Sequence, residues 1–215
     1  MLGESIGRNS LLLGFFAILS TAIIAGTYLG SKETIRENIR MAEERALLEI
    51  VPRFRHNNSM LEDAHGINDS EMLGLRAEKK YYIARQDGEP VAVIFPATAR
   101  EGYTGDIDMI IGINVDGTIA GVRVLSHRET PGLGDAIDLK KSQWIDSFIN
   151  KSLLNPTVDL WKVKKDKGVF DQFTGATITP RAVTKIVLQT LQYFNQHQHD
   201  ILKQPITTDT EGQKL

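Results

Sequence analysis

Hydrophobic and polar residues divide the chain into an uncharged N-terminal segment and a longer region of mixed patterns. Residues 11–29 (LLLGFFAILSTAIIAGTYL) contain no charged side chain. A helix of roughly 19 residues is roughly 28 Å long at about 1.5 Å per residue, which is close to the hydrocarbon core of a bilayer at about 30 Å. The pattern predicts a transmembrane anchor, embedded in the lipid bilayer, over residues 1–30.

A cleaved signal peptide is the alternative interpretation of this segment. Such a peptide begins with a basic region and has a shorter apolar run, but the residues before position 11 offer only Arg8 against Glu4. A buried helix is a further alternative, although nothing else in the chain could enclose so apolar a segment. We expect an anchor, and the sequence leaves open whether it is retained.

The charges that flank the anchor give a mixed signal about its orientation. Lys32, Arg36, Arg40 and Arg45 follow the apolar segment, whereas Arg8 alone precedes it. Counted by lysine and arginine, this bias favours a cytoplasmic C-terminal domain. Four glutamates lie among the same cations and weaken the signal.

Residues 31–75 are expected to form a juxtamembrane helix and a connector. Apolar residues at positions 35, 39, 42 and 46 share one stripe of a helix that begins at Ser31, as its N-cap, and ends near Pro52. Residues 53–75 show no clear period and include the polar run HNNSM. We therefore expect them to be mostly irregular.

Residues 76–203 alternate in the way that strands do and then end in a helical pattern. YYIAR and VAVIFPA flank a QDGEP turn, and IDMIIGINV and TIAGVRVLSH flank Asp-Gly, the strongest short-range signal of a hairpin. Helices are expected over residues 136–150 and from Thr179 onward, with Pro180 in the first turn. Their predicted buried residues are Ile137, Trp144, Ile145 and Phe148 in the first, and Val183, Ile186, Val187, Leu191 and Phe194 in the second.

These elements predict an α+β fold, with a mostly antiparallel sheet packed by helices. The polar residues 204–215 are expected to be a disordered tail.

The chain has 215 residues, 41% hydrophobic and 24% charged, which suits one domain and an anchor. A net charge of −2 provides no basic field, so no nucleic acid partner is expected. The absence of cysteine excludes disulfides, cysteine-ligated zinc and iron–sulfur clusters.

Two polar stretches carry the candidate chemistry, and the first is FTGATITPRAV at residues 173–183. A helix N-terminus exposes unpaired N–H groups and partial positive charge, and Gly175 lets the backbone approach a ligand closely. Thr174, Thr177 and Thr179 add hydroxyl groups, so the stretch fits a phosphate site. The alternative is an ordinary helix cap, with Thr179 as cap and Pro180 after it.

The second stretch is HRETPGLGD, at residues 127–135, after the last predicted strand. Pro131 fixes its own φ, Gly132 and Gly134 permit positive φ, and Leu133 projects from the loop. The alternative is a plain turn between a strand and a helix. Neither stretch has metal-ligand spacing or a spaced nucleophile, so we expect no metal site and no catalytic residue.

Residues 102–135 (GYTGDIDMIIGINVDGTIAGVRVLSHRETPGLGD) and 161–183 (WKVKKDKGVFDQFTGATITPRAV) together resemble the FMN-binding domain of membrane electron-transport complexes. The resemblance is to the G subunit of Rnf-type complexes and to its relative, the C subunit of the sodium-pumping NADH:quinone reductase. It covers almost the whole chain, including the anchor. The short length favours the Rnf-type subunit.

The resemblance implies that FMN is covalently attached to Thr177 through a phosphoester. It implies a flavin pocket shaped by Glu129, Thr130, Pro131, Gly132, Leu133, Gly134, Thr174, Gly175 and Ala176. It also implies that a separate flavin transferase, which donates FMN from FAD with magnesium, recognises Asp171 together with Thr174, Gly175, Ala176 and Thr177. The FMN domain would face outward from the bacterial cytoplasmic membrane, against the lysine and arginine count.

The predicted function is therefore electron relay within a membrane-bound, ion-translocating oxidoreductase complex. The partners implied are the other subunits, the flavin transferase and the lipid bilayer, and the chain is not expected to catalyse a complete reaction alone. One alternative is a membrane-tethered, non-redox domain that binds or senses a phospho-ligand, but it leaves ETPGLGD without a role. Another is a structural subunit without a cofactor, which the intact Thr177 and Asp171 disfavour.

Overall fold

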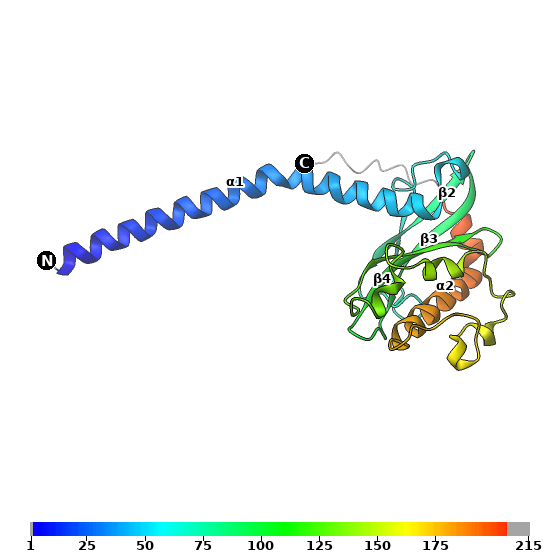
Figure 1. The fold of residues 1–215 in the computed structure, drawn as a ribbon. Coiled ribbons are helices and arrows are strands. Elements are labelled where there is room, and N and C mark those ends of the chain that lie inside the picture. Colours follow the sequence, from blue (N-terminus) through cyan, green and yellow to red (C-terminus); the bar gives the residue numbers. More distant parts are fainter. Residues whose placement is uncertain (1, 206–215) are drawn as a thin grey trace. The chain divides into compact units, whose positions relative to one another are not determined.

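The computed structural model describes residues 2–205, with side chains described from Ile6 onward. Its first element is the helix α1 (Leu2–Ile50) (Figure 1). Residues up to Arg45 form one compact unit, and the chain from Ala46 onward forms a second. The second unit contains the sheet and all of the candidate site.

Helix α1 contains the predicted anchor and extends beyond it. Its most apolar window has no buried residue, and the helix is long and apolar enough to cross a membrane. The prediction of a separate helix that begins at Ser31 was wrong, because α1 passes through this position without a break. A serine inside a helix is tolerated when the surrounding residues, here rich in Glu, Arg and Ala, favour helix. The predicted end near Pro52 is confirmed, since α1 ends at Ile50.

The second unit is built on a five-stranded antiparallel sheet in which each strand pairs with its neighbour in sequence. The strands are β1 (Ala64–Ile67), β2 (Lys79–Gln86), β3 (Glu89–Ala99), β4 (Ile107–Asn114) and β5 (Ile119–Ser126). Both predicted hairpins are present, and their Asp-Gly turns contain Gly88 at φ 87° and Gly117 at φ 81°. Strand β1 was not predicted, although the rest of residues 53–75 is mostly irregular as expected.

Apolar residues alternate between the two faces of the sheet, and both faces are covered. Met109, Ile111 and Ile113 of β4 belong to the main core beneath the second long helix, α2 (Ile178–Leu202). Ile110 of β4 belongs to a smaller core with Ile50 and other residues that follow Arg45. Gly112 is required on this second face, because a side chain there would collide with Ile50.

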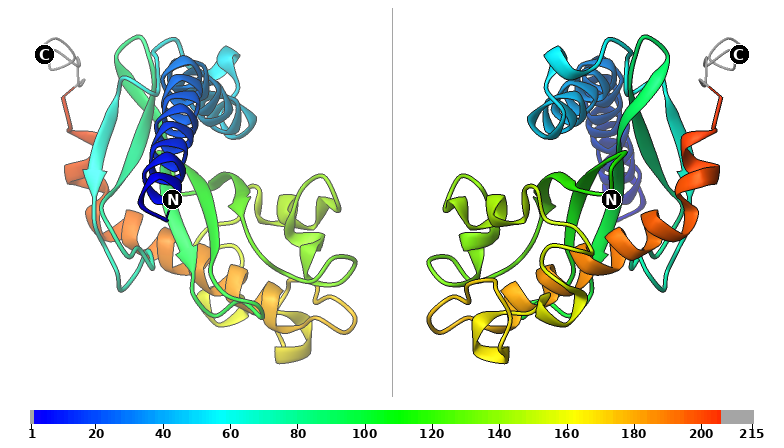
Figure 2. Two further views of the ribbon diagram at one scale, coloured as in Figure 1. Left: turned by 90° about the vertical axis from the view of Figure 1, so that its left-hand side faces the viewer. Right: turned by 90° about the vertical axis from the view of Figure 1, so that its right-hand side faces the viewer.

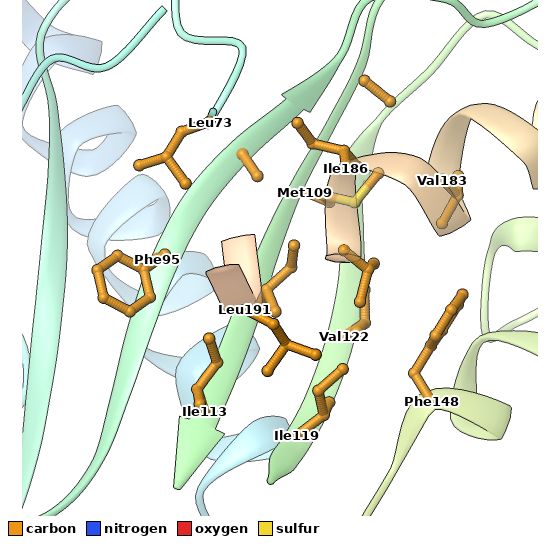
Figure 3. Close-up of a cluster of buried hydrophobic side chains, with 14 of the residues drawn as sticks. Leu73, Phe95, Met109, Ile113, Ile119, Val122, Phe148, Val183, Ile186 and Leu191 are labelled. Atoms are coloured by element: carbon orange, nitrogen blue, oxygen red, sulfur yellow. The ribbon is translucent and has the colours of Figure 1, made fainter. Parts of the chain in front are cut away.

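Helix α2 runs across one face of the sheet in both views of Figure 2. All five residues of its predicted stripe are buried, and Figure 3 shows Val183, Ile186 and Leu191 among core side chains of the sheet. The helix begins at Ile178, one residue before the predicted start, with Thr177 at its N-cap position. Of the predicted tail, residues 206–215 lie outside the described part.

The predicted helix over residues 136–150 was wrong. The structure has 3₁₀ helices at Gly134–Ile137 and Gln143–Phe148 instead. The Asp138 carboxylate accepts the N–H of Lys140 at 2.9 Å, and the Ser142 hydroxyl accepts the N–H of Trp144 at 3.1 Å. Such local side-chain bonds compete with the helical pattern. The four residues predicted to be buried in this segment are nevertheless buried.

Candidate functional site

The two polar stretches meet at one cavity, which we call the loop cavity. Its volume is about 320 Å³. One side comes from the connection after β5 and from Tyr103 before β4, and the other comes from the turn that precedes α2 and the first residues of α2. The lining residues are Tyr103, Glu129, Thr130, Leu133, Gly134, Gly175, Ala176, Thr177, Ile178 and Thr179.

The connection after β5 has a compact shape that depends on both of its glycines. The N–H groups of Leu133 and Gly134 donate to the Thr130 carbonyl, each at 3.1 Å. Gly132 has a φ of 76°, as predicted, and its N–H donates to the Asp135 carboxylate at 2.7 Å. Gly134 does not adopt positive φ. It is needed because a Cβ there would lie 2.9 Å from both Glu129 Oε2 and Thr179 Oγ1.

Glu129 joins the connection to two other parts of the domain. Its side chain is buried, and one carboxylate oxygen accepts the N–H and the hydroxyl of Thr104, each at 2.9 Å. The other oxygen accepts the hydroxyl of Thr179. Burial raises the pKa of Glu129, but the hydrogen bonds from Thr179 and Thr104 outweigh this effect and hold the pKa below its ordinary value. The carboxylate is therefore negative at neutral pH.

The turn before α2 presents Thr177 without using its side chain as a cap. The Ala176 N–H donates to the Phe173 carbonyl at 3.2 Å, which closes the turn. Gly175 sits in it at φ 80°, a conformation that L side chains resist. Thr177 is half-buried and makes no side-chain cap hydrogen bond, although it occupies the N-cap position. Thr177 thus lies at a helix N-terminus and lines the loop cavity.

The alternative interpretation, in which Thr179 caps the helix, was wrong. Thr179 is fully buried inside the first turn of α2, and its hydroxyl donates to Glu129. This contact joins residues 50 positions apart, so no local pattern could reveal it. It ties the turn before α2 to the connection after β5 and so holds the two polar stretches together.

The remaining predicted site residues lie outside the cavity lining. Pro131, Gly132 and Thr174 are exposed near it, at the outer parts of their turns. Asp171 is also exposed, and its carboxylate pairs with Lys164 Nζ at 2.6 Å. The Asp171 carbonyl accepts the indole N–H of Trp144 at 2.8 Å, so its backbone is fixed while its side chain faces solvent.

Sequence reasoning missed several residues of the site. Tyr103 and Ile178 line the cavity, and Thr104 holds Glu129. The sequence offered a signal for Tyr103, because this residue lies in the polar, glycine-rich segment GYTGD just before β4. Over residues 2–205, the structure has no group of three or more His, Asp or Glu side chains that could hold a metal ion.

Two protein families match parts of this chain. Residues 102–192 match the FMN-binding domain family, and residues 1–50 match the RnfG N-terminal region. The G subunit of the ion-translocating oxidoreductase complex of Vibrio atlanticus is 44% identical over 208 residues, covering 97% of this chain and 99% of the relative. The corresponding protein of Pseudomonas aeruginosa, which has the same name, is 43% identical over 199 residues, covering 93% of each chain.

The family match spans both parts of the chain. The matched FMN-binding domain contains the whole loop cavity, and the matched N-terminal region contains the helix of membrane-spanning length. A third relative, from Shewanella loihica, is 44% identical and covers 97% of this chain and 98% of its own length. The chain belongs to the G subunits of ion-translocating oxidoreductase complexes, with an FMN-binding domain that follows an N-terminal helix of membrane-spanning length.

Proposed function

We propose that this protein relays electrons within its complex through an FMN that is joined by a phosphoester to Thr177. The observation that carries the proposal is the meeting of ETPGLGD and TGAT at one cavity, with Thr177 among its lining residues. FMN supplies the redox chemistry when bound, and the protein supplies orientation and electrostatics. The other subunits of the complex are the proposed partners in this relay.

The residues present at the helix N-terminus fit an attached phosphate. A phosphodiester keeps one negative charge, and the N-terminus of α2 carries partial positive charge and unpaired N–H groups. Gly175 leaves the backbone of the turn uncovered, since a Cβ at this position would meet only Leu133 Cδ2, at 3.6 Å. Such interactions contribute about 0.3–1 kcal/mol each at exposed sites, so a covalent bond is what would retain the cofactor.

Glu129 has a positioning role in this proposal. Its carboxylate is negative and lines the loop cavity, so it repels a phosphate and favours its placement toward the N-terminus of α2. Through Thr179 it also fixes the start of α2 against the connection after β5. The distance between the two motifs is thus set by a buried, charge-assisted contact.

Attachment by a separate flavin transferase fits the exposure of the turn. Asp171 and Thr174 are exposed, and Thr177 is half-exposed, so an enzyme that holds FAD and magnesium can reach them from solvent. The anchored domain is proposed to lie on the outer face of the bacterial cytoplasmic membrane. This orientation follows the family resemblance and goes against the lysine and arginine count.

Mass spectrometry of the intact chain, co-expressed with a flavin transferase, tests the attachment. We expect wild type to carry one added FMN phosphoester and Thr177→Val to carry none. Thr174→Val is the comparison variant, because it removes an exposed hydroxyl of the same turn. This hydroxyl is expected to position rather than to react, so the variant should lower attachment less than Thr177→Val does. Flavin that stays bound to Thr177→Val through denaturing electrophoresis would contradict the assignment of Thr177.

A further inference from the structure

Residues 154–169, in the connection between β5 and α2, carry exposed apolar and basic side chains that we call the lysine face. Its six members are Leu154, Leu160, Lys162, Lys165, Lys167 and Val169. All six are exposed, and Leu154 has 88% of its surface in solvent. Single exposed apolar residues are normal on a protein surface, whereas several of them in one short segment indicate a site of interaction.

Backbone contacts bring the members of the lysine face together. The Val169 N–H donates to the Leu160 carbonyl at 3.2 Å, and the chain between these two residues turns back at residues 164–167. The Leu160 N–H donates to the Thr157 carbonyl at 2.9 Å, and Thr157 in turn pairs with Leu154 in an antiparallel bridge. The three apolar members therefore belong to one compact region, with the lysines at its turn.

The lysine face is fixed to the core and to the start of α2. Trp161 is buried, and its indole N–H donates to the carbonyls of Ser152 and Pro156 at 3.1 and 3.2 Å. Asp166 accepts two hydrogen bonds from Arg181 of α2, at 2.5 and 2.6 Å, and the segment (yellow) lies beside the first turns of α2 in Figure 2. A surface that is rigid in this way loses little conformational freedom when it binds a partner.

The lysine face also lies next to the proposed attachment point of the flavin. The Arg181 N–H donates to the Thr177 carbonyl at 3.4 Å, so the residue that holds Asp166 is one helical turn from Thr177. Lys164 lies between the lysines of the face and pairs with Asp171, in the stretch that leads to Thr177, at 2.6 Å. A protein bound to the lysine face would therefore come close to the flavin.

Positive charge is concentrated on the lysine face, although the chain as a whole is negative. Residues 162–167 contain four lysines and one aspartate, whereas the net charge of the chain is −2. The aspartate is paired with Arg181, and the three lysines of the face form no ion pair with the part of the chain that the structure describes. Such a local field attracts and orients a surface that carries negative charge.

This combination of side chains favours an acidic protein surface over two other occupants. Segments that lie in a membrane interface are enriched in exposed tryptophan and tyrosine, but Trp161 is buried and the exposed apolar members are aliphatic. A second copy of this chain, bound through the same face, would place lysines against lysines, which is repulsive.

We propose that the lysine face is the docking surface for the redox subunit that exchanges electrons with the flavin, and that this subunit presents carboxylates around an apolar patch. The inference rests on the proposed function, and it adds the surface and the chemistry of the partner. The lysine face forms and breaks no bond, since electrons pass only between FMN and the redox group of the partner, one being oxidised as the other is reduced. Contacts between redox partners are small, which suits a compact face.

Zero-length cross-linking of the intact, purified complex tests the contact directly. A carbodiimide joins a lysine amine to a carboxylate that touches it. Mass spectrometry should find Lys162, Lys165 or Lys167 joined to Asp or Glu residues of another subunit. Lys80 is the control, because it is exposed on β2, at the other side of the sheet from β5. Cross-links to other subunits that arise from Lys80 but from none of the three lysines would overturn the proposal.

Charge reversal tests whether the contact serves electron transfer. The combined variant Lys162→Glu, Lys165→Glu and Lys167→Glu should slow electron transfer through the complex by about tenfold or more at low salt. The difference from wild type should shrink as salt is added. Lys167→Glu and Lys80→Glu form a matched pair of single reversals, of which only the first should slow the transfer. Normal rates in the combined variant, with FMN attached, would overturn the proposal.

Two further measurements separate the outcomes. Mass spectrometry reports attached FMN in every variant, and its loss from the combined variant alone would assign the lysine face to the flavin transferase instead. Wild type without covalent FMN would overturn the proposed function, while the cross-links would still decide the contact. Leu154→Cys, labelled with an environment-sensitive dye in full-length protein in nanodiscs, tests the membrane. A shift in dye emission when phosphatidylglycerol replaces phosphatidylcholine would assign the face to the lipid surface.

Discussion

The sheet and the connection from residue 127 to residue 177 are built in different ways. The sheet is held by alternating apolar side chains and by regular pairing between sequence neighbours. The connection has no long helix or strand. It packs Ile137, Trp144, Phe148 and other apolar side chains into the same core. Its turns depend on individual polar contacts of Glu129, Asp135, Asp138 and Ser142. The residues of both motifs lie on the connection. The exposed turns at Gly132 and Gly175 can therefore change their local geometry while the core remains folded.

The largest loss of stability is expected from a substitution in the core of the sheet. Phe95 is fully buried at the centre of β3, in contact with the rings of Tyr81 and Phe194. Phe95→Ala should lower the free energy of unfolding by about 3–5 kcal/mol, because it leaves a cavity in the core. Denaturant unfolding of the full-length protein in detergent measures this loss. A loss below about 1 kcal/mol would mean that the sheet does not carry the stability of the domain.

A smaller loss of stability is expected from Glu129→Gln, which keeps the shape of the side chain and removes its charge. Three donor groups, two from Thr104 and one from Thr179, face this carboxylate. An amide places its own N–H₂ against some of them, which should cost about 3 kcal/mol. Thermal unfolding at neutral pH measures the difference from wild type.

The same pair of proteins tests the pH dependence. Because the folded pKa of Glu129 is lowered, its contribution to stability is present above the unfolded pKa of about 4.3 and is lost as pH falls through the folded value. The stability gap between wild type and Glu129→Gln should therefore narrow in acid. A constant gap from neutral pH to below pH ~4 would show that the charge is not the cause.

Two glycine substitutions sharpen the comparison between the regions. Gly132 lies in the connection at φ 76°, and Gly117 lies in the β4–β5 turn at φ 81°, each with nothing within 4 Å of a new Cβ. Valine at either position should cost about 1–2 kcal/mol through the left-handed conformation. Only Gly132→Val should also shift the flavin potential in a redox titration. If the flavin potential of Gly132→Val were the same as that of Gly117→Val and of wild type, ETPGLGD would be a plain turn.

The smallest loss of stability is expected from an exposed ion pair on α2. Lys185 and Glu101 form an exposed ion pair, and such pairs contribute about 0.2–1 kcal/mol. Lys185→Gln should therefore change the unfolding midpoint little, and raising the salt concentration should reduce the difference further. Glu101→Gln is the matched control and should give the same small change. A large loss in only one variant would indicate another contact of that residue.

The regular parts of the fold could be predicted because their patterns are local. Period-two alternation and Asp-Gly turns identified β2 to β5, and a helical stripe identified α2. Strand β1 was missed because the residues AHGI have no apolar alternation and depend on pairing with β2. The helix over residues 136–150 failed because Asp138 and Ser142 bond to their own local backbone.

The site was predictable only where it repeats a known motif. The resemblance identified ETPGLGD and TGAT, and the structure brings them to one cavity. The contact between Thr179 and Glu129 could not be predicted, since nothing local links the two residues.

The order of the strands has a consequence for the synthesis of this chain. Each strand pairs with the one made just before it, so the sheet can assemble hairpin by hairpin as the polypeptide emerges. Helix α2 is made last, and until it docks the face of the sheet that carries Phe95, Met109 and Ile111 stays uncovered. A chain truncated before residue 178 would expose this apolar face and be prone to aggregate. Translation that stops early should therefore yield insoluble fragments rather than a smaller stable domain.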